Sequence, residues 1–377
     1  MSRFILVLLA FAFGVGLWTG RATKPATVTD PHWAVAGELS RPRAYATALA
    51  LETGEILVVG GLDARDPRVT LSTAELFDPT TGRVTVLPQQ LLGRLHQSMT
   101  EAPGGRVVVT GGTEWVGDHW NSVDDVDLYL VWSRTWLRAA PMRQPRSDHG
   151  ATLLLDGRVL VTGGNYNTRI VRPTEIYDPA TNRWTAAEPL PRGRTQFSVA
   201  TLPDGTVLVA GGFQEDGAMT TTTLIYEPWA DRWVEGPEAR EVRLNHSMVQ
   251  LASGDLLFFG GEAMGGESAE LYSWRDRRFL YAGILGDPRL IAQGAVLPDG
   301  RVVAVGGLLV DRDRRRFDPT VGAEVWDPQK RVWRDISDAP TKRAYAQLIV
   351  TDRGAYRISG VGENEASFAT IEALVLD

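Results

Sequence analysis

The amino-acid sequence predicts an all-β fold of seven small antiparallel sheets, and three observations support this prediction. A Gly-Gly pair or its degenerate copy recurs seven times after short apolar runs. An arginine lies 17 residues before the first glycine of every copy, and another glycine lies six residues before that first glycine. Self-similarity at a period of about 50 residues is typical of a repeat protein in which each repeat forms one supersecondary unit.

The stretch from Arg146 to Trp184 shows how one repeat is expected to fold. Two apolar runs meet at Asp156-Gly157, which predicts a β-hairpin with a type I′ turn, because both residues tolerate positive φ. A second hairpin is expected, with Tyr177 near the end of one strand and a turn at Asp178 to Asn182. Trp184 then lies in the fourth strand, so one repeat supplies a four-stranded sheet.

The spacing within the repeat is constant except in one segment. Large apolar residues, mostly aromatic, precede the arginines by ten positions and, for the six arginines from Arg94 onward, also by 17 positions. Only the segment from Gly-Gly to the next aromatic residue changes in length, so the variation falls in the connection between the second and third strands. In a repeat protein such segments lie on one face, which is the expected binding face. The arginines, interpreted as structural, are Arg43, Arg94, Arg146, Arg194, Arg243, Arg289 and Arg343.

Gly-Gly after an apolar strand, followed by Tyr and then Trp at this period, resembles the kelch repeat over residues 31–377. The resemblance implies a β-propeller like the central domain of galactose oxidase, with four-stranded blades around a channel. The seventh copy, at Gly360, ends after its third strand, whereas Trp33 precedes Arg43 by ten residues. The predicted fold is therefore a seven-bladed β-propeller of four-stranded antiparallel blades, the last closed by the N-terminal strand.

Residues 1–30 lie outside the repeat. Residues 1–22 are interpreted as a signal peptide or membrane anchor, and residues 23–30 as a linker to the propeller at 31–377. Arg3 precedes an uncharged stretch from Phe4 to Gly20, which suits a secretory signal and reaches the short limit for a membrane span. Both alternatives predict an extracytoplasmic protein, secreted or periplasmic. Membrane association is expected only through residues 4–20.

Composition excludes several kinds of function. The net charge of −7 and the pI near 5.4 argue against a broad nucleic-acid-binding surface. The chain contains no cysteine, so its stability must come from blade packing rather than from disulfides. A copper radical site like that of galactose oxidase is set aside, because that family's cofactor needs a cysteine joined to a tyrosine. No cofactor is predicted.

Function is expected where the blades differ at one shared location. The residues 15 and 14 positions before each Gly-Gly open the innermost strand beside the channel mouth, and the loops after Gly-Gly lie on the same face. Aromatic and polar side chains around a concavity suit a sugar or a peptide. The predicted ligand-binding residues are Tyr45, His96, Asp148, His149, Gln196, Asn245, His246, Tyr345, Glu114, Trp115, Tyr166, Gln214 and Glu262.

Three hypotheses share these residues. The preferred one is a binding module for a glycan or for a peptide or protein partner on the variable-loop face. The second is an enzyme in which Asp148 or Glu262 acts as acid or base beside His149; the resemblance to exported kelch proteins that are sialic-acid epimerases implies sugar isomerisation. The third is a metal site at His96, His149 and His246, whose imidazoles would suit zinc.

Overall fold

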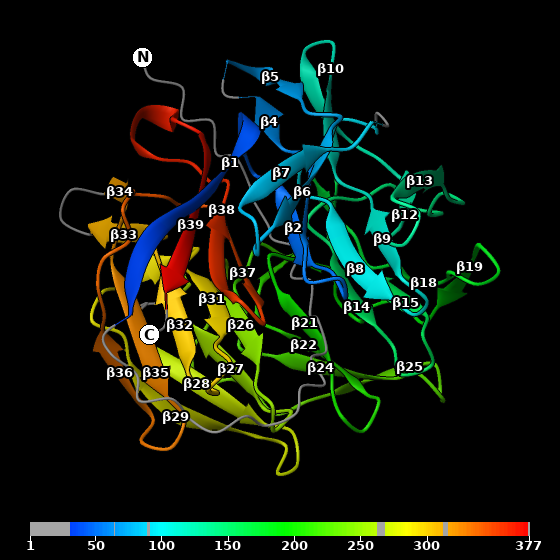
Figure 1. The fold of residues 1–377 in the computed structure, drawn as a ribbon. Helices are drawn as coiled ribbons and strands as arrows, with labels where there is room; N and C mark the ends of the chain where they lie inside the picture. The colour runs from blue at the N-terminus through cyan, green and yellow to red at the C-terminus, as the bar shows by residue number, and fades with distance from the viewer. Residues whose placement is uncertain (1–30, 64, 89–90, 262–267, 312–315, 376–377) are drawn as a thin grey trace, which may run out of the picture.

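The computed structural model describes residues 31–63, 65–88, 91–261, 268–311 and 316–375 (Figure 1). These residues contain strands and turns but no α-helix, and their one helical segment is a 3-10 turn at Glu363–Glu365 (η1). Within the described ranges, no helix has the length and apolar character needed to cross a membrane. The all-β fold expected from the sequence is confirmed. The interpretations of residues 1–22 and 23–30 lie outside the described residues.

Six sheets have four antiparallel strands each, and we number them sheets 1 to 6 in chain order. Sheet 1 comprises β2 (Thr47–Ala50), β3 (Ile56–Val59), β6 (Ala74–Asp78) and β7 (Arg83–Val86). Sheet 2 comprises β8 (Ser98–Ala102), β9 (Arg106–Thr110), β12 (Val126–Leu130) and β13 (Thr135–Arg138). Sheet 3 comprises β14 (Gly150–Leu153), β15 (Val159–Thr162), β18 (Thr174–Asp178) and β19 (Arg183–Ala187). Sheet 4 comprises β21 (Ser198–Thr201), β22 (Val207–Ala210), β24 (Thr223–Glu227) and β25 (Arg232–Glu235). Sheet 5 comprises β26 (Ser247–Gln250), β27 (Leu256–Phe259), β28 (Ser268–Ser273) and β29 (Arg278–Ile284). Sheet 6 comprises β31 (Gln293–Val296), β32 (Val302–Val305), β35 (Ala323–Asp327) and β36 (Val332–Asp335).

Sheet 7 joins the two ends of the described chain. Its strands, in spatial order, are β37 (Gln347–Thr351), β38 (Gly354–Ile358), β39 (Phe368–Val375), β1 (His32–Ala44), β4 (Leu62–Asp63) and β5 (Asp66–Thr70). Strand β1 pairs with β39 so that Trp33 lies opposite Leu374. The backbone groups of β39 are therefore paired on both sides rather than left at an open edge.

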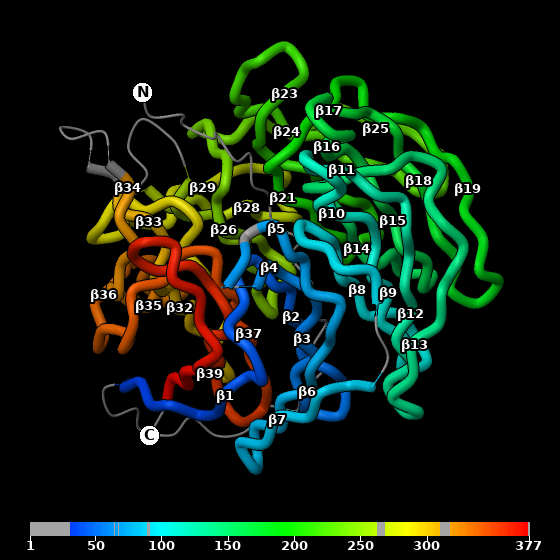
Figure 2. Tube along the Cα trace, turned by 90° about the horizontal axis from the view of Figure 1, so that it is seen from above, coloured from blue at the N-terminus to red at the C-terminus, as the bar shows by residue number. Residues whose placement is uncertain are grey.

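The first strands of the seven sheets lie innermost. They contact one another in the order β2, β8, β14, β21, β26, β31 and β37, and β37 contacts β2 in turn. Figure 2 shows the sheets following one another about a common centre. Second strands such as β3 and β15 are buried along their whole length, which explains why they read as continuous apolar runs rather than alternating ones.

The remaining short strands extend the connections between sheets and within them. They are β10 (Thr113–Val116), β11 (His119–Ser122), β16 (Asn165–Tyr166), β17 (Arg169–Ile170), β20 (Arg194–Thr195), β23 (Phe213–Gln214), β30 (Arg289–Leu290), β33 (Leu308–Asp311) and β34 (Arg316–Pro319). Strands β4 and β5, β10 and β11, β16 and β17, and β33 and β34 pair as hairpins between the second and third strands of sheets 1, 2, 3 and 6. The segments of variable length therefore contain much of the additional strand structure.

The predicted type I′ turn at Asp156-Gly157 is wrong. Gly157 has a φ of 86°, whereas Asp156 is not among the residues with positive φ. The Leu154 N–H donates to the Arg158 carbonyl at 2.8 Å, so the loop has three residues and ends in a left-handed glycine. The Asp156 carboxylate accepts the Arg158 N–H at 3.1 Å, which explains why aspartate suits a position that needs no positive φ.

Each repeat arginine ties three strands of its sheet together. In sheet 3, Arg146 Nη1 donates to the carbonyls of Gly163 at 3.0 Å and Pro173 at 2.7 Å. Its Nη2 donates at 2.8 Å to Glu175 on the third strand, and the arginine side chain is fully buried. The Glu175 carboxylate also accepts the Arg143 N–H at 2.8 Å, so it anchors the segment that enters the sheet.

These acidic partners were not predicted from the sequence, although they recur two residues before the aromatic position of the third strand. The buried pairs are Arg43–Glu75, Arg94–Asp127, Arg146–Glu175, Arg243–Glu270, Arg289–Glu324 and Arg343–Glu372. Sheet 4 departs from the series, because Leu224 occupies the acidic position. Burial without a carboxylate lowers the pKa of Arg194 to about 10.

Candidate functional site

Seven residues with left-handed backbone conformation lie at the start of the innermost strands, 15 positions before each Gly-Gly. They are Tyr45, His96, Asp148, Gln196, Asn245, Ile291 and Tyr345, with φ from 52° to 57°, and we call them the ring residues. Backbone hydrogen bonds join neighbours among them: the Asp148 N–H donates to the His96 carbonyl at 3.2 Å, and the Ile291 N–H donates to the Asn245 carbonyl at 3.0 Å. A non-glycine residue in this region costs on the order of 1 kcal/mol or more, so the surrounding packing imposes it.

Four ring residues bring their side chains together from sheets 7, 1, 2 and 3. The rings of Tyr45 and Tyr345 lie 4.9 Å apart between centroids, and those of Tyr45 and His96 lie 5.8 Å apart. His96 Nδ1 lies 3.3 Å from an Asp148 carboxylate oxygen. Burial raises the pKa of Tyr45 to about 12, so its phenol is neutral near pH 7. These side chains form one aromatic and acidic cluster.

His96 and Asp148 are the central pair of this cluster. Burial lowers the pKa of His96, while the Asp148 charge opposes that shift in part. Asn165 Nδ2 donates to the other Asp148 carboxylate oxygen at 3.0 Å and to the Thr195 hydroxyl at 3.0 Å, which fixes the orientation of the carboxylate. His96 Nε2 is buried and has no hydrogen-bond partner among the described residues.

The histidines one position further along point elsewhere, contrary to expectation. His149 Nε2 lies 2.9 Å from the Thr110 hydroxyl on β9, and His246 Nε2 lies 2.8 Å from the Ser198 hydroxyl on β21. Both imidazoles are buried between sheets, where burial lowers the pKa of His246 to about 3. The carboxylate next to His149 in sequence pairs with His96 instead, because the left-handed backbone at Asp148 sends the two neighbouring side chains in different directions.

The structure does not assemble the three histidines of the metal hypothesis. The His149 and His246 imidazoles contact different neighbouring sheets, and His96 lies beside Asp148. Across the described ranges, no group of three His, Asp or Glu residues could hold a metal ion. Glu262, predicted both as a ligand-binding and as a catalytic residue, lies outside the described residues.

Other predicted residues divide between buried and accessible positions. Gln196 and Gln214 are buried, and Asn245 is half-buried. Glu114 and Trp115 are half-buried on β10, where burial and the charge of Asp125 raise the pKa of Glu114. Tyr166 is exposed on β16. Tyr166, on the β16/β17 hairpin, is therefore the most accessible of the predicted residues that the structure describes.

The β10/β11 hairpin presents an aromatic pair. Trp115 and Trp120 pack edge to face, with ring centroids 5.1 Å apart. Two hydrogen bonds of 2.8 Å between Ser122 and Asn167 join this hairpin to the β16/β17 hairpin, and β10 also contacts β5. In Figure 1 β10 projects beyond the sheets on the same side as β4 and β5. Trp120 was not among the residues predicted from the sequence, although its spacing from Trp115 fits a short hairpin.

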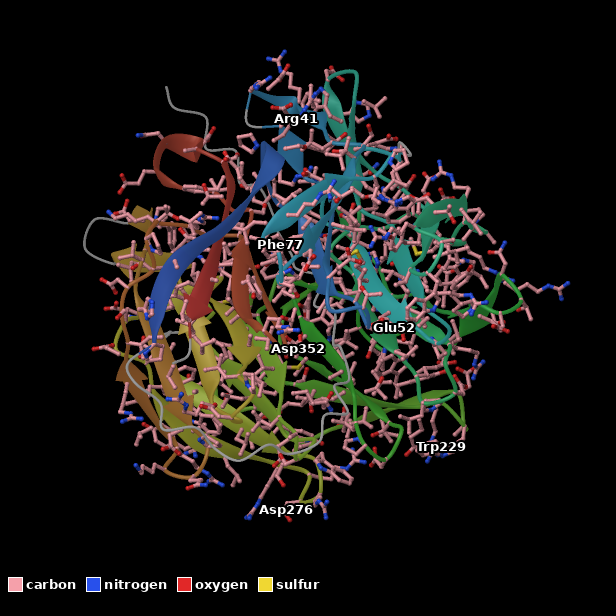
Figure 3. All side chains as sticks on the ribbon, in the orientation of Figure 1. Arg41, Glu52, Phe77, Trp229, Asp276 and Asp352 are labelled. Carbon is pink, nitrogen blue, oxygen red and sulfur yellow. The ribbon has the colours of Figure 1, made fainter. Side chains whose placement is uncertain are left out.

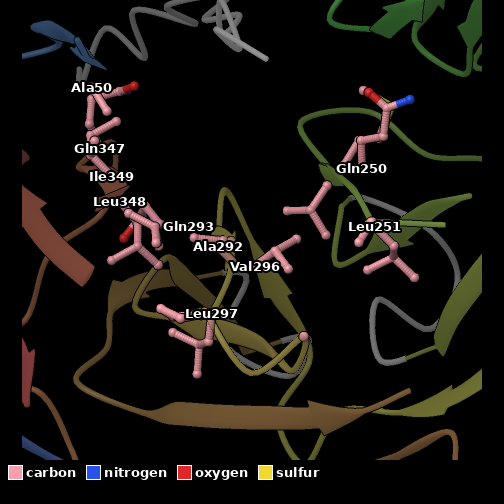
Figure 4. Close-up of a pocket in the computed structure, with 18 of the residues that line it drawn as sticks. Ala50, Gln250, Leu251, Ala292, Gln293, Val296, Leu297, Gln347, Leu348 and Ile349 are labelled. Atoms are coloured by element: carbon pink, nitrogen blue, oxygen red, sulfur yellow. The ribbon is translucent and has the colours of Figure 1, made fainter. Parts of the chain in front are cut away.

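A cavity of about 590 Å³ lies beside the innermost strands β2, β26, β31 and β37. Figure 4 shows Gln347 and Ile349 on one side, Gln250 and Leu251 on the other, and Val296 between them. Ile291, Ala292 and Ala346 give part of its lining an apolar character. The volume falls within the usual range of ligand pockets.

These features define the chain as an all-β repeat protein with four-stranded antiparallel sheets of the propeller type. Residues 145–191 match the family model described as Kelch motif. The mouse Kelch-like protein 35 is 32% identical over 145 residues, which are 38% of this chain and 23% of that protein. These matches support the resemblance to the kelch repeat that the sequence indicates, and this chain spans about a quarter of the mouse protein's length.

A solved structure shows a related fold over most of the chain. It is a fungal alcohol oxidase of the AA5 family in complex with copper, with a TM-score of 0.73 and 18% sequence identity. The similarity covers 92% of this chain and 77% of the oxidase. At this identity the similarity shows the fold alone.

Proposed function

We propose that this chain is an exported interaction module, a seven-bladed kelch propeller that holds a peptide or protein partner on its variable-loop face. The seven sheets would be the blades, and β1 would close the last one. The cyclic contact order of the innermost strands and the pairing of β1 with β39 support this arrangement. Kelch repeats commonly mediate protein interaction, which supports the class of partner.

The observation that carries this proposal is the aromatic β10/β11 hairpin, anchored by a neighbouring hairpin. Trp115 and Trp120 are half-buried, so each keeps surface for a ligand while packing holds its ring in place. Tyr166 on the adjoining hairpin adds a third accessible ring. Rigid aromatic side chains supply much of the binding energy of protein interfaces at low entropic cost.

A peptide array and a glycan array, both probed with the full chain, test the proposal. Replacing Trp115 and Trp120 together by alanine should weaken binding to any peptide hit by at least about tenfold, in line with the loss of hot-spot aromatics. Tyr281→Ala is the matched control, because Tyr281 is an exposed aromatic on β29 of sheet 5. Unchanged affinity in the double variant would refute this location, and hits confined to glycans would change the partner to a sugar.

A sugar-modifying enzyme is the second candidate, and the His96–Asp148 pair favours it. A neutral imidazole with an unpartnered Nε2 and an oriented carboxylate could move a proton at a bound sugar. The test is NMR of candidate sugars incubated with the chain and with Asp148→Asn. Turnover that disappears in the variant would support catalysis, whereas saturable shifts without turnover would support binding alone.

A further inference from the structure

Three strongly exposed apolar side chains lie at turns on the far side from the variable segments. Trp132 is 69% exposed, Trp229 is 68% exposed and Leu155 is 64% exposed. Trp132 and Trp229 occupy the turns between the third and fourth strands of sheets 2 and 4, and Leu155 occupies the turn between the first two strands of sheet 3. In antiparallel four-stranded sheets these turns share one face, opposite to the connections between the second and third strands.

The three side chains form one surface with the turns around them. A Cβ built on Gly205 would lie 3.2 Å from Leu155 Cδ1 and 4.0 Å from Trp229 Cζ3, so both side chains flank this glycine. A Cβ on Gly105 would meet Trp132 Nε1 at 2.5 Å, and one on Gly157 would meet Pro103 at 3.1 Å. We call Trp132, Leu155, Trp229 and Pro103 the apolar strip. Figure 3 shows Trp229 far from Arg41, at the opposite end of the molecule.

The N-terminal strand begins on the same face. His32 pairs with Val375 one step beyond Trp33 and Leu374. In sheet 2 the equivalent pair is Thr135 with Leu130, and in sheet 4 it is Arg232 with Glu227. These two pairs flank the turns that contain Trp132 and Trp229. The chain upstream of His32 therefore leaves from the face that bears the apolar strip.

The sequence upstream contains the uncharged stretch from Phe4 to Gly20. Eleven residues, Arg21 to Pro31, separate it from His32. A fully extended linker of this length spans at most about 40 Å. If residues 4–20 are retained in a membrane, the face with His32 is the face that the linker holds nearest to the bilayer.

The charges around the apolar strip favour an uncharged surface over a polyanionic one. Acidic and basic side chains on these turns pair with each other, as in Arg158–Asp156, Arg232–Glu227 and Arg277–Asp204. Paired charges of opposite sign leave little field to attract anionic lipid headgroups. Tryptophan, by contrast, is enriched at the membrane–water interface, where its ring is apolar and its N–H stays hydrated.

We infer that this face docks on the surface of a lipid bilayer in which residues 4–20 are embedded. Trp132, Leu155 and Trp229 would enter the interfacial region, and the variable-loop face would point away from the membrane. The inference goes beyond the proposed function and does not rest on the identity of its partner.

The absence of cysteine from the chain allows a site-specific test. The full chain with Leu155→Cys, labelled with an environment-sensitive fluorophore, is reconstituted into phosphatidylcholine vesicles with and without spin-labelled acyl chains. Val116→Cys is the matched control, because Val116 is an exposed apolar residue on the β10/β11 hairpin. We expect spin-label quenching at position 155 to be several-fold stronger than at position 116. High salt and added anionic lipid should change this ratio little.

A double variant separates docking from simple tethering. Trp132→Ser with Trp229→Ser should leave the melting temperature nearly unchanged, because both rings are mostly exposed, and should remove the quenching at position 155. Equal quenching at positions 155 and 116, or unchanged quenching in the double variant, would overturn the inference. So would mass spectrometry of the exported protein showing that residues 4–20 have been removed.

Discussion

Replacing Glu175 by glutamine tests how much one arginine–acid pair contributes to the fold. The carboxylate accepts hydrogen bonds from Arg146 Nη2 at 2.8 Å and from the Arg143 and Gln144 N–H groups at 2.8 and 3.2 Å. Glutamine keeps the shape of the side chain, but it removes the charge and places an NH₂ group where one of these donors needs an acceptor. The buried Arg146 guanidinium would then lack a counter-charge.

The expected loss follows from the burial of both partners. Glu175 and Arg146 are almost completely buried, and removing one partner of a buried ion pair typically costs about 3–5 kcal/mol. Sheet 4 already holds Arg194 without a carboxylate, which shows that the fold tolerates such a guanidinium when carbonyls accept its N–H groups. We therefore expect the lower end of this range, about 3 kcal/mol.

Urea unfolding followed by tryptophan fluorescence measures this loss. The control is Asp156→Asn, which breaks the partly exposed pair with Arg158 and should cost less than about 1 kcal/mol. A Glu175→Gln protein within 1 kcal/mol of the parent would refute the view that these pairs stabilise the sheets.

Three further predictions concern pH, backbone and closure. Burial lowers the pKa of His246 from 6.5 to about 3, so below pH 6.5 the unfolded chain binds a proton more tightly than the folded chain does. The contribution of His246 to the free energy of unfolding is therefore complete above pH 6.5 and is lost as the pH falls toward 3. His246→Gln, which copies Gln97 at the equivalent position of sheet 2, should flatten the fall in melting temperature over that range; an unchanged slope would contradict the assignment. Gly164→Ala should destabilise the fold strongly, because its φ is 92° and the new Cβ would lie 2.4 Å from the Ser147 carbonyl oxygen. The control is Gly117→Ala, whose φ is 63° and whose new Cβ would meet no atom within 4 Å. This control should cost about 1 kcal/mol in the same urea denaturation assay. Deleting residues 31–38 removes most of the β1–β39 pairing and should abolish cooperative unfolding in calorimetry; a deletion protein as stable as the parent would disprove closure by β1.

The sequence by itself determined the all-β class, the strand order and the position of the variable segments. These features are local or periodic: each Gly-Gly pair needs positive φ, as Gly163 and Gly164 show with 60° and 92°. Each hairpin also closes within a few residues, and the pairing of Tyr177 with Trp184 follows the spacing between them. Patterns that repeat seven times report such short-range constraints reliably.

Only the tertiary structure decided which of the predicted site residues meet. Asp148 and His149 are neighbours in sequence, yet one contacts His96 and the other packs against Thr110 in a different environment. The left-handed backbone of the ring residues sends adjacent side chains in these directions, and side chains as unlike as Ile291 and Tyr345 adopt it. No residue preference marks that conformation, because packing between sheets imposes it. The exposed Trp132 and Trp229 likewise stand out only once the turns that bear them are placed on one face.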